Sequence, residues 1–267
     1  MRMRTAAVWL VVMLTALSAC GMARHRAQIR QGLLTRGLHR EAFLAEWGQP
    51  ARTFPLADRW LGSCLAQTYP NRRFFMAGTA AGIVSTSAAA LSAPPPPNGN
   101  IFERLDAHGI RWRDYYSDLA GVGVLLAYAV KHLDNLSPID QFFSDAAAGT
   151  LPAVSLVDPN FDTQSEENPQ DIGQGEAFAA RVINAVMAGP GWPRTVLVWL
   201  YDEHGGYYDH VPPPRAIPPD DIPPDIHVPP DQPGGYDRYG FRVPAVVVSP
   251  WARRHQSHTS SAITLRY

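Results

Sequence analysis

Cysteine, net charge and long apolar runs are all scarce in this sequence. The 267 residues include two cysteines, Cys20 and Cys64, and carry a formal net charge of −1. The chain can therefore form at most one intramolecular disulfide, and none if Cys20 is modified. A near-neutral balance lacks the excess of Lys and Arg that marks a nucleic-acid-binding surface, so we expect no nucleic-acid partner. With 46% hydrophobic and 18% charged residues, the chain can bury a substantial core.

One apolar stretch stands at the N-terminus, over residues 6–19. It is shorter than the about 20 residues that a transmembrane helix needs. It follows Arg2 and Arg4 and ends in Leu17-Ser18-Ala19-Cys20, which resembles a bacterial lipobox. The pattern predicts an export signal over residues 1–20, with Cys20 as the lipidated residue that anchors the mature protein to the membrane of the cell envelope. The alternative is an ordinary secretory signal with a chance cysteine, which predicts a secreted protein.

Proline is abundant but unevenly distributed. Ten of the 25 prolines lie between residues 212 and 233, where neither a helix nor an interior strand can form. We expect a long extended loop there, of the kind that covers a site or contacts a partner. Residues 21–53 are typical of a linker or peripheral helix, and residues 54–267 of one folded domain.

The folded region alternates helical and strand patterns. The helical patterns start near Thr68 and cover 101–107, 125–136 and 173–187. The strand patterns cover 110–116, 151–157, 195–200 and 243–249. This alternation favours an α/β fold in three layers, with a mostly parallel sheet between helices.

The most informative segment follows the predicted strand 195–200. Tyr201-Asp202-Glu203-His204 comes directly after it, then a glycine pair, and then Asp209-His210. The carboxyl ends of strands are where open α/β sheets bind their ligands. Carboxylates and imidazoles suit a hard cation or a phosphoryl group. The alternative is a strand end whose charges are merely solvated.

Several spaced motifs resemble the bacterial phosphoesterase family, which contains exported phospholipases C and a related acid phosphatase. They are TYPNR at 68–72, Gly175-Glu176, YDEHGGYYDHVPPP at 201–214, and YGFRVPAVVVSPWAR at 239–253. The resemblance covers about residues 54–260. It implies the α/β/α fold of the alkaline phosphatase-like superfamily, and phosphoester hydrolysis through a hydroxyl nucleophile with a divalent cation.

The resemblance also implies roles for single residues. Thr68 matches the nucleophile, and Asp202 and Glu203 match the metal-binding acids. A Thr hydroxyl needs a metal or a base to become a good nucleophile, and a helix N-terminus offers N–H donors to phosphate oxygens. Without the resemblance, Thr68 is better interpreted as a helix cap.

Other residues of the motifs keep two interpretations. His204 and His210 either protonate the leaving alkoxide or orient a phosphate oxygen, or they tie the glycine turn to a neighbouring carboxylate. Asn71 and Arg72 either contact the phosphate of the substrate or shape the start of the helix. Asp209 is interpreted as structural.

Three features depart from the family's pattern. The early Glu-Asn-(Arg/His)-Ser-Phe-Asp motif, which completes the metal site and the first core strand, is not found. Glu167-Asn168-Pro169 stands where Glu-His-Pro is common, and an amide cannot shuttle a proton at neutral pH. Ser257-His258-Thr259-Ser260 stands in place of Asp-His-Thr-Ser. We therefore expect an incomplete version of the fold with a weakened metal site.

Three functions are compatible with these patterns. The first is an exported phospholipase C-type enzyme that hydrolyses the phosphodiester of a phospholipid headgroup with Thr68 and a divalent cation. The second is an acid phosphatase-like phosphomonoesterase, because the same core serves both reactions. The third is a surface lipoprotein that keeps the scaffold without turnover.

Overall fold

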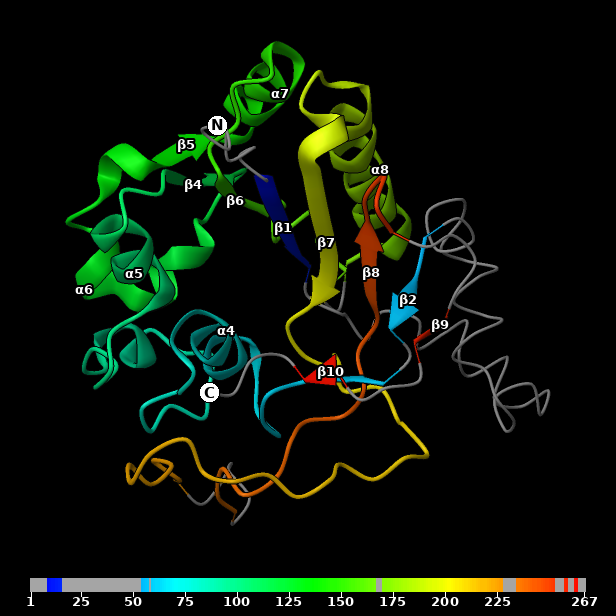
Figure 1. Cartoon of the computed structure of the whole chain (residues 1–267). Helices are drawn as coiled ribbons and strands as arrows, with labels where there is room; N and C mark the ends of the chain where they lie inside the picture. Colours follow the sequence, from blue (N-terminus) through cyan, green and yellow to red (C-terminus); the bar gives the residue numbers. More distant parts are fainter. Residues whose placement is uncertain are drawn as a thin grey trace, which may run out of the picture.

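The fold is built on one large sheet with helices on both faces (Figure 1). The computed structural model describes residues 9–15, 54–57, 59–166, 170–227, 234–252, 257–258 and 262–263. Its eight-stranded sheet has the order β5-β4-β6-β1-β7-β8-β2-β9. The strands are β1 (Trp9–Thr15), β2 (Leu56–Ala57), β4 (Trp112–Tyr116), β5 (Leu136–Pro138), β6 (Val154–Asp158), β7 (Thr195–Tyr201), β8 (Ala245–Val248) and β9 (Ser257–His258). A second sheet pairs β3 (Trp60–Leu61) with β10 (Ala262–Ile263).

Most of the large sheet is parallel, as the sequence predicts. β5, β4, β6, β1 and β7 all run parallel to their neighbours. β8 is antiparallel to β7, and β2 is antiparallel to β8. The carboxyl ends of β6, β1 and β7 therefore meet at one edge of the sheet.

Two layers of helices flank this sheet. The α-helices are α4 (Thr68–Ala77), α5 (Ile101–Ala107), α6 (Leu126–Ala129), α7 (Ile139–Ala148) and α8 (Ile172–Ala188). Short 3₁₀ helices are η1 (Ala89–Ser92), η2 (Gly121–Leu125), η3 (Leu133–Asn135) and η4 (Trp192–Arg194). The three-layer α/β/α architecture is confirmed.

The period of two in β7 divides its side chains between the two faces. Trp199 and Tyr201 join the core formed with α7 and α8. Leu200 joins the core formed with α4 and α5. Residues at i and i+2 of a strand share a face, so the residue after Tyr201 points toward the layer that contains α4.

Some element predictions hold and others fail. Residues 101–107 form α5, begun by a capping box between Asn100 and Glu103. The helix predicted over 125–136 is wrong, because only the four residues of α6 are α-helical there and β5 begins at Leu136. The helix near Thr68 is confirmed, but Gln67 occupies its N-cap and Thr68 is its first residue. α7 follows Pro138 and is not predicted by the sequence.

The proline-rich segment is extended, as predicted for its described part, residues 212–227. It holds no helix and only an isolated bridge at Arg215. Asp220 accepts a hydrogen bond from Thr79 Oγ1 (2.5 Å), and the Asp225 amide donates to the carbonyl of Gly82 (2.8 Å). These contacts hold the loop against the segment that follows α4 (Figure 1).

The described part of the N-terminal apolar stretch, residues 9–15, lies within the large sheet. Residues 9–15 form β1, which pairs in parallel with β6 on one side and β7 on the other. Cys20 and the predicted linker 21–53 lie outside the described residues. Cleavage before Cys20 would remove residues 9–15 from the mature chain. The same residues therefore cannot both be cleaved off as an export signal and form β1 of the mature protein. No helix in the described part of the chain has the length and apolar character needed to cross a membrane.

Candidate active site

Three aspartates meet on the α4 side of the sheet. Asp158 ends β6, Asp202 follows β7, and Asp114 of β4 pairs with Leu156, two residues before Asp158. Each is at most 3% exposed. Buried carboxylates need a positive or hydrogen-bonding partner, so their environment defines what this edge of the sheet can do.

The partner of two of these aspartates is Arg72 on α4. Its Nη1 donates to Asp158 Oδ1 at 2.7 Å, and its Nε donates to Asp202 Oδ2 at 2.9 Å. The guanidinium is 2% exposed and lies over the ring of Phe161, with 5.0 Å from its carbon to the ring centroid. Burial alone would lower the pKa of Arg72. The two carboxylates raise the pKa by more than burial lowers it, so the guanidinium stays charged.

A tight turn supports the carboxylates from the other side. The amide of Gly121 donates to Asp158 Oδ2 (3.0 Å), and the amide of Val122 donates to Asp114 Oδ2 (2.8 Å). A Cβ at position 121 would lie 2.4 Å from that oxygen of Asp158 and 2.9 Å from Arg72 Nη1, so only glycine fits. Burial and the charge of Asp158 raise the pKa of Asp114 well above its usual value, which favours a neutral acid there.

Thr68 lies one helical turn before Arg72. Residues at i and i+4 of a helix share a face, with Cβ atoms about 5–6 Å apart. Thr68 therefore lies on the face of α4 that carries Arg72, whose guanidinium contacts Asp202, although 134 positions separate residues 68 and 202 in the sequence. Thr68 is buried, and within the described residues nothing hydrogen-bonds its hydroxyl.

The two acids predicted to bind a metal are already engaged. Asp202 Oδ2 accepts from Arg72, and its Oδ1 accepts from the Glu203 amide at 3.1 Å. Glu203 Oε2 accepts from the Gly205 amide at 2.8 Å. Within the described residues, no three His, Cys, Asp or Glu side chains form a group that could hold a metal ion. As arranged, the described side chains do not fit a divalent cation, because a guanidinium already faces Asp202.

The two histidines differ in their surroundings. The side chain of His204 is 24% exposed, with Nδ1 3.4 Å from Glu203 Oε2 and its ring 4.7 Å from that of Phe241. His210 is 59% exposed, and its Nδ1 lies 3.6 Å from Asp209. Both lie in the loop after β7, and His204 is the more buried of the two.

Asp209 and Asn71 make contacts of structural residues. Asp209 binds Arg242 through both oxygens, at 2.7 and 2.8 Å. Asn71 Oδ1 accepts from the amides of Ser63 and Cys64, and its Nδ2 donates to three backbone carbonyls within 3.3 Å. The structural interpretation of Asp209 agrees with its contacts. The predicted substrate contact of Asn71 requires hydrogen bonds of the loop before α4 to break, so the contacts favour the alternative role in shaping the helix start.

A buried acid on the opposite face has no counterpart in the sequence prediction. Glu166 Oε2 accepts from the Tyr201 hydroxyl at 2.7 Å, and burial, with Glu176 nearby, raises the pKa of Glu166 to about 8. A Cβ on Gly175 of α8 would lie 2.2 Å from Glu166 Cγ, so the helix packs directly on this acid. Glu167-Asn168-Pro169, the altered family motif, lies outside the described residues.

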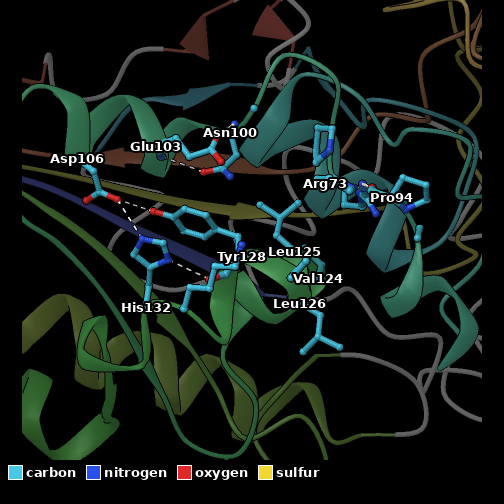
Figure 2. Close-up of a pocket in the computed structure, with 16 residues that line it drawn as sticks. Arg73, Pro94, Asn100, Glu103, Asp106, Val124, Leu125, Leu126, Tyr128 and His132 are labelled. Atoms are coloured by element: carbon cyan, nitrogen blue, oxygen red, sulfur yellow. Dashed lines mark hydrogen bonds and ion pairs between the residues drawn. The ribbon is translucent and has the colours of Figure 1, made fainter.

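A separate cavity of about 420 Å³ contains none of the predicted site residues (Figure 2). Its polar groups satisfy one another: the Tyr128 hydroxyl donates to Asp106 (2.6 Å), and the ring of His132 stacks on that of Tyr128 (3.9 Å). Arg73, the neighbour of Arg72 on α4, lines this cavity and donates to the carbonyl of Pro94 (2.6 Å). The candidate active site is therefore the strand edge, and this cavity is distinct from it.

The fold is like that of solved structures that include a protein of the alkaline phosphatase superfamily. It is similar to a superfamily member from Vibrio parahaemolyticus, with a TM-score of 0.56 and 9% identity over 97% of this chain and 64% of that chain. It is also similar to Ps i-CgsB, with a TM-score of 0.52 and 9% identity over 97% of this chain and 70% of that one.

The chain belongs to the Phosphoesterase family, whose profile matches residues 36–261. It is 33% identical to non-specific phospholipase C6 of Arabidopsis thaliana over 222 residues, which cover 78% of this chain and 41% of that protein. It is 30% identical to phospholipase C A of Mycobacterium tuberculosis over 235 residues, 76% of this chain and 45% of that protein. The chain thus spans less than half the length of these relatives.

Proposed function

We propose that this chain hydrolyses phosphodiesters in the manner of a phospholipase C, at the carboxyl edge of the sheet. One observation carries the proposal. The contact of Arg72 with Asp202 brings the helix that starts at Thr68 against the acidic end of β7. The named phospholipase C relatives support a phospholipid as the substrate.

Thr68 is the proposed nucleophile. Its Oγ1 attacks phosphorus, and this new O–P bond forms as the bond from phosphorus to the diacylglycerol oxygen breaks. The position of Thr68 in the first turn of the ten-residue α4 places negative charge at the positive end of the helix dipole. Water then attacks the phosphothreonine, which releases the phosphorylated headgroup and restores the hydroxyl.

His204 is the proposed general acid. In the first step the hydroxyl proton of Thr68 passes to water, and protonated His204 gives its proton to the leaving alkoxide. In the second step His204 takes a proton from the attacking water, and the threonine alkoxide is reprotonated from solvent. Its half-buried position beside Glu203 suits this role better than the exposed position of His210.

The test compares Thr68→Ala with the matched variant Thr68→Ser on a chromogenic phosphodiester and a chromogenic phosphomonoester. We expect Thr68→Ala to abolish diester hydrolysis with the fold intact by circular dichroism, and Thr68→Ser to retain part of it. Preferential hydrolysis of the monoester supports the phosphomonoesterase alternative. A parent protein that hydrolyses neither substrate, with or without added divalent ions, supports the non-catalytic lipoprotein and overturns the proposal.

Export and anchoring form a separate part of the proposal. The lipobox-like ending at Cys20 supports lipidation and attachment to the cell envelope. We expect Cys20→Ala to release the protein from the membrane fraction. Mass spectrometry of the purified protein tests the same point, because a mature chain that still contains residues 9–15 contradicts cleavage before Cys20.

A further inference from the structure

One nitrogen of the Arg72 guanidinium makes no hydrogen bond within the part of the chain that the structure describes. Its Nε and Nη1 are used by Asp202 and Asp158, but Nη2 is buried and has no partner among the described residues. A buried donor without an acceptor costs free energy, so native proteins seldom leave one. The unused Nη2 is therefore a candidate contact for a ligand that the site takes up.

The position of this donor suits a phosphoryl group. Arg72 lies one turn after Thr68 on the same face of α4, so the residue with the unused donor and the proposed nucleophile are neighbours on that helix. Guanidinium groups bind phosphate oxygens through charge-assisted hydrogen bonds. Asp158 and Asp202 hold the guanidinium rigidly, which removes the entropy cost of ordering a long side chain at the moment of binding.

The charge around Arg72 selects among phosphate esters. One guanidinium faces Asp114, Asp158 and Asp202, so the cluster stays net negative even when one of the three carries a proton. A phosphodiester carries one negative charge, whereas a phosphomonoester carries close to two above its second pKa near 6. The repulsion is therefore larger for the monoester.

Access to Nη2 requires a neighbouring side chain to move, because the atom is buried. The half-buried Phe161 is the candidate, since its ring faces the guanidinium. It lies in the segment after β6, where its amide donates to Asp118 at 2.8 Å.

We propose that Arg72 is a substrate-binding residue whose Nη2 donates to a non-bridging oxygen of a phosphodiester monoanion. The guanidinium then supplies, between Asp158 and Asp202, the positive charge that a divalent cation was predicted to supply. This inference rests on the proposed function, because it assigns the substrate contact of that same site.

The experiment measures binding without turnover. Bis(4-nitrophenyl) phosphate and 4-nitrophenyl phosphate are titrated calorimetrically into the Thr68→Ala protein at pH 8 with a chelator present. We expect the diester to bind without added metal and at least tenfold more tightly than the monoester. Diester binding that disappears with chelator and returns with a divalent ion overturns the proposal.

Two arginine variants, made on the Thr68→Ala background, locate the contact. Arg72→Lys keeps the charge but loses the forked donor, and we expect it to bind the diester at least tenfold more weakly. Arg73→Lys is the matched control, because Arg73 is equally buried on α4 but donates to Pro94 in the separate cavity. We expect it to bind as the Thr68→Ala protein does. Equal binding by the Arg72→Lys protein overturns the proposal.

Phe161→Ala keeps the test decisive if Arg72→Lys does not fold. We expect removal of the ring to leave diester binding by the Thr68→Ala protein unchanged or tighter, and a tenfold loss contradicts the assigned contact. Failure of this inference is distinguishable from failure of the proposed function. If the parent protein binds the diester through Arg72 but never hydrolyses it, only the proposed function is contradicted. If the Arg72→Lys protein hydrolyses the diester as fast as the parent, only this inference is contradicted.

Discussion

The two faces of the sheet differ in the side chains that they carry at the carboxyl ends of β6 and β7. On the side of α7 and α8, Val157 and Tyr201 continue an apolar core to the very ends of β6 and β7. On the side of α4, the next residues along the same strands are Asp158 and Asp202, held by Arg72. One face is closed by a helix that packs on the sheet, and the other ends in buried charge.

This difference indicates where chemistry is possible. The apolar face holds the buried acid Glu166 by a hydrogen bond from Tyr201, and α8 packs directly against it. The charged face keeps an unused donor on Arg72 and a hydroxyl on Thr68 at the start of a helix. The groups available for the proposed reaction therefore lie on the second face.

The largest effect is expected from breaking the ion-pair cluster. Asp158→Ala leaves Arg72 with one buried carboxylate partner and frees the Gly121 amide, so we expect a loss of about 3–5 kcal/mol in the free energy of unfolding. Urea denaturation measures it. The exposed Asp162, four residues further on, is the control, and Asp162→Ala should change stability by less than about 0.5 kcal/mol. Equal effects of both variants contradict a buried cluster.

A pH-dependent effect is expected on the opposite face. The pKa of Glu166 is about 8 in the folded protein against an ordinary 4.5, so between these values the folded state holds a proton that the unfolded state has lost. Stability contributed by the protonated acid is therefore fully present below pH 4.5 and falls as the pH rises toward 8.

Glu166→Gln tests this pH dependence. The amide keeps an acceptor for Tyr201 without a charge to bury, so we expect a gain on the order of 1–3 kcal/mol at pH 8 and little change at pH 4.5. Thermal unfolding measured across this range provides the data. If the stabilities of the Glu166→Gln and parent proteins differ by the same amount at every pH, Glu166 does not titrate as described.

The smallest effect is expected from Asp114→Asn. Burial and Asp158 favour the neutral form of Asp114, and an amide oxygen can still accept from the Val122 amide. We therefore expect a change below about 1 kcal/mol at neutral pH, in contrast to Asp158→Ala. Denaturation of both variants under the same conditions sharpens the comparison, and a loss as large as that of Asp158→Ala shows that Asp114 is ionised.

Local signals were enough to predict the layers and the strand edge. The apolar run 195–200 followed by Asp202 marks both a buried strand and the place where it ends. The amphipathic pattern over residues 101–107 predicts α5, and the proline cluster excludes regular structure over residues 212–227. These features depend on neighbours in the sequence, which is why the sequence shows them.

The partners within the site depend on contacts that no local pattern encodes. Arg72 lies 86 positions before Asp158 and 130 before Asp202, so its role as the central cation follows from the tertiary fold. Asp114 lies inside a predicted strand, where the sequence alone favours a solvent-exposed acid between buried neighbours. Nothing in the local pattern indicates that Asp114 is buried. A period-two reading of β4, β6 and β7 would have placed the three aspartates on one face, but only the register of the strands shows that they meet.

The most direct measurement of the central claim is the site of covalent modification during turnover. The purified chain is mixed with a chromogenic phosphodiester, quenched in acid within the steady state, and digested for mass spectrometry. The account predicts a phosphoryl-ester adduct on Thr68, in the peptide that also contains Arg72. Turnover accompanied by an adduct on another residue, or undiminished turnover in Thr68→Ala, contradicts it.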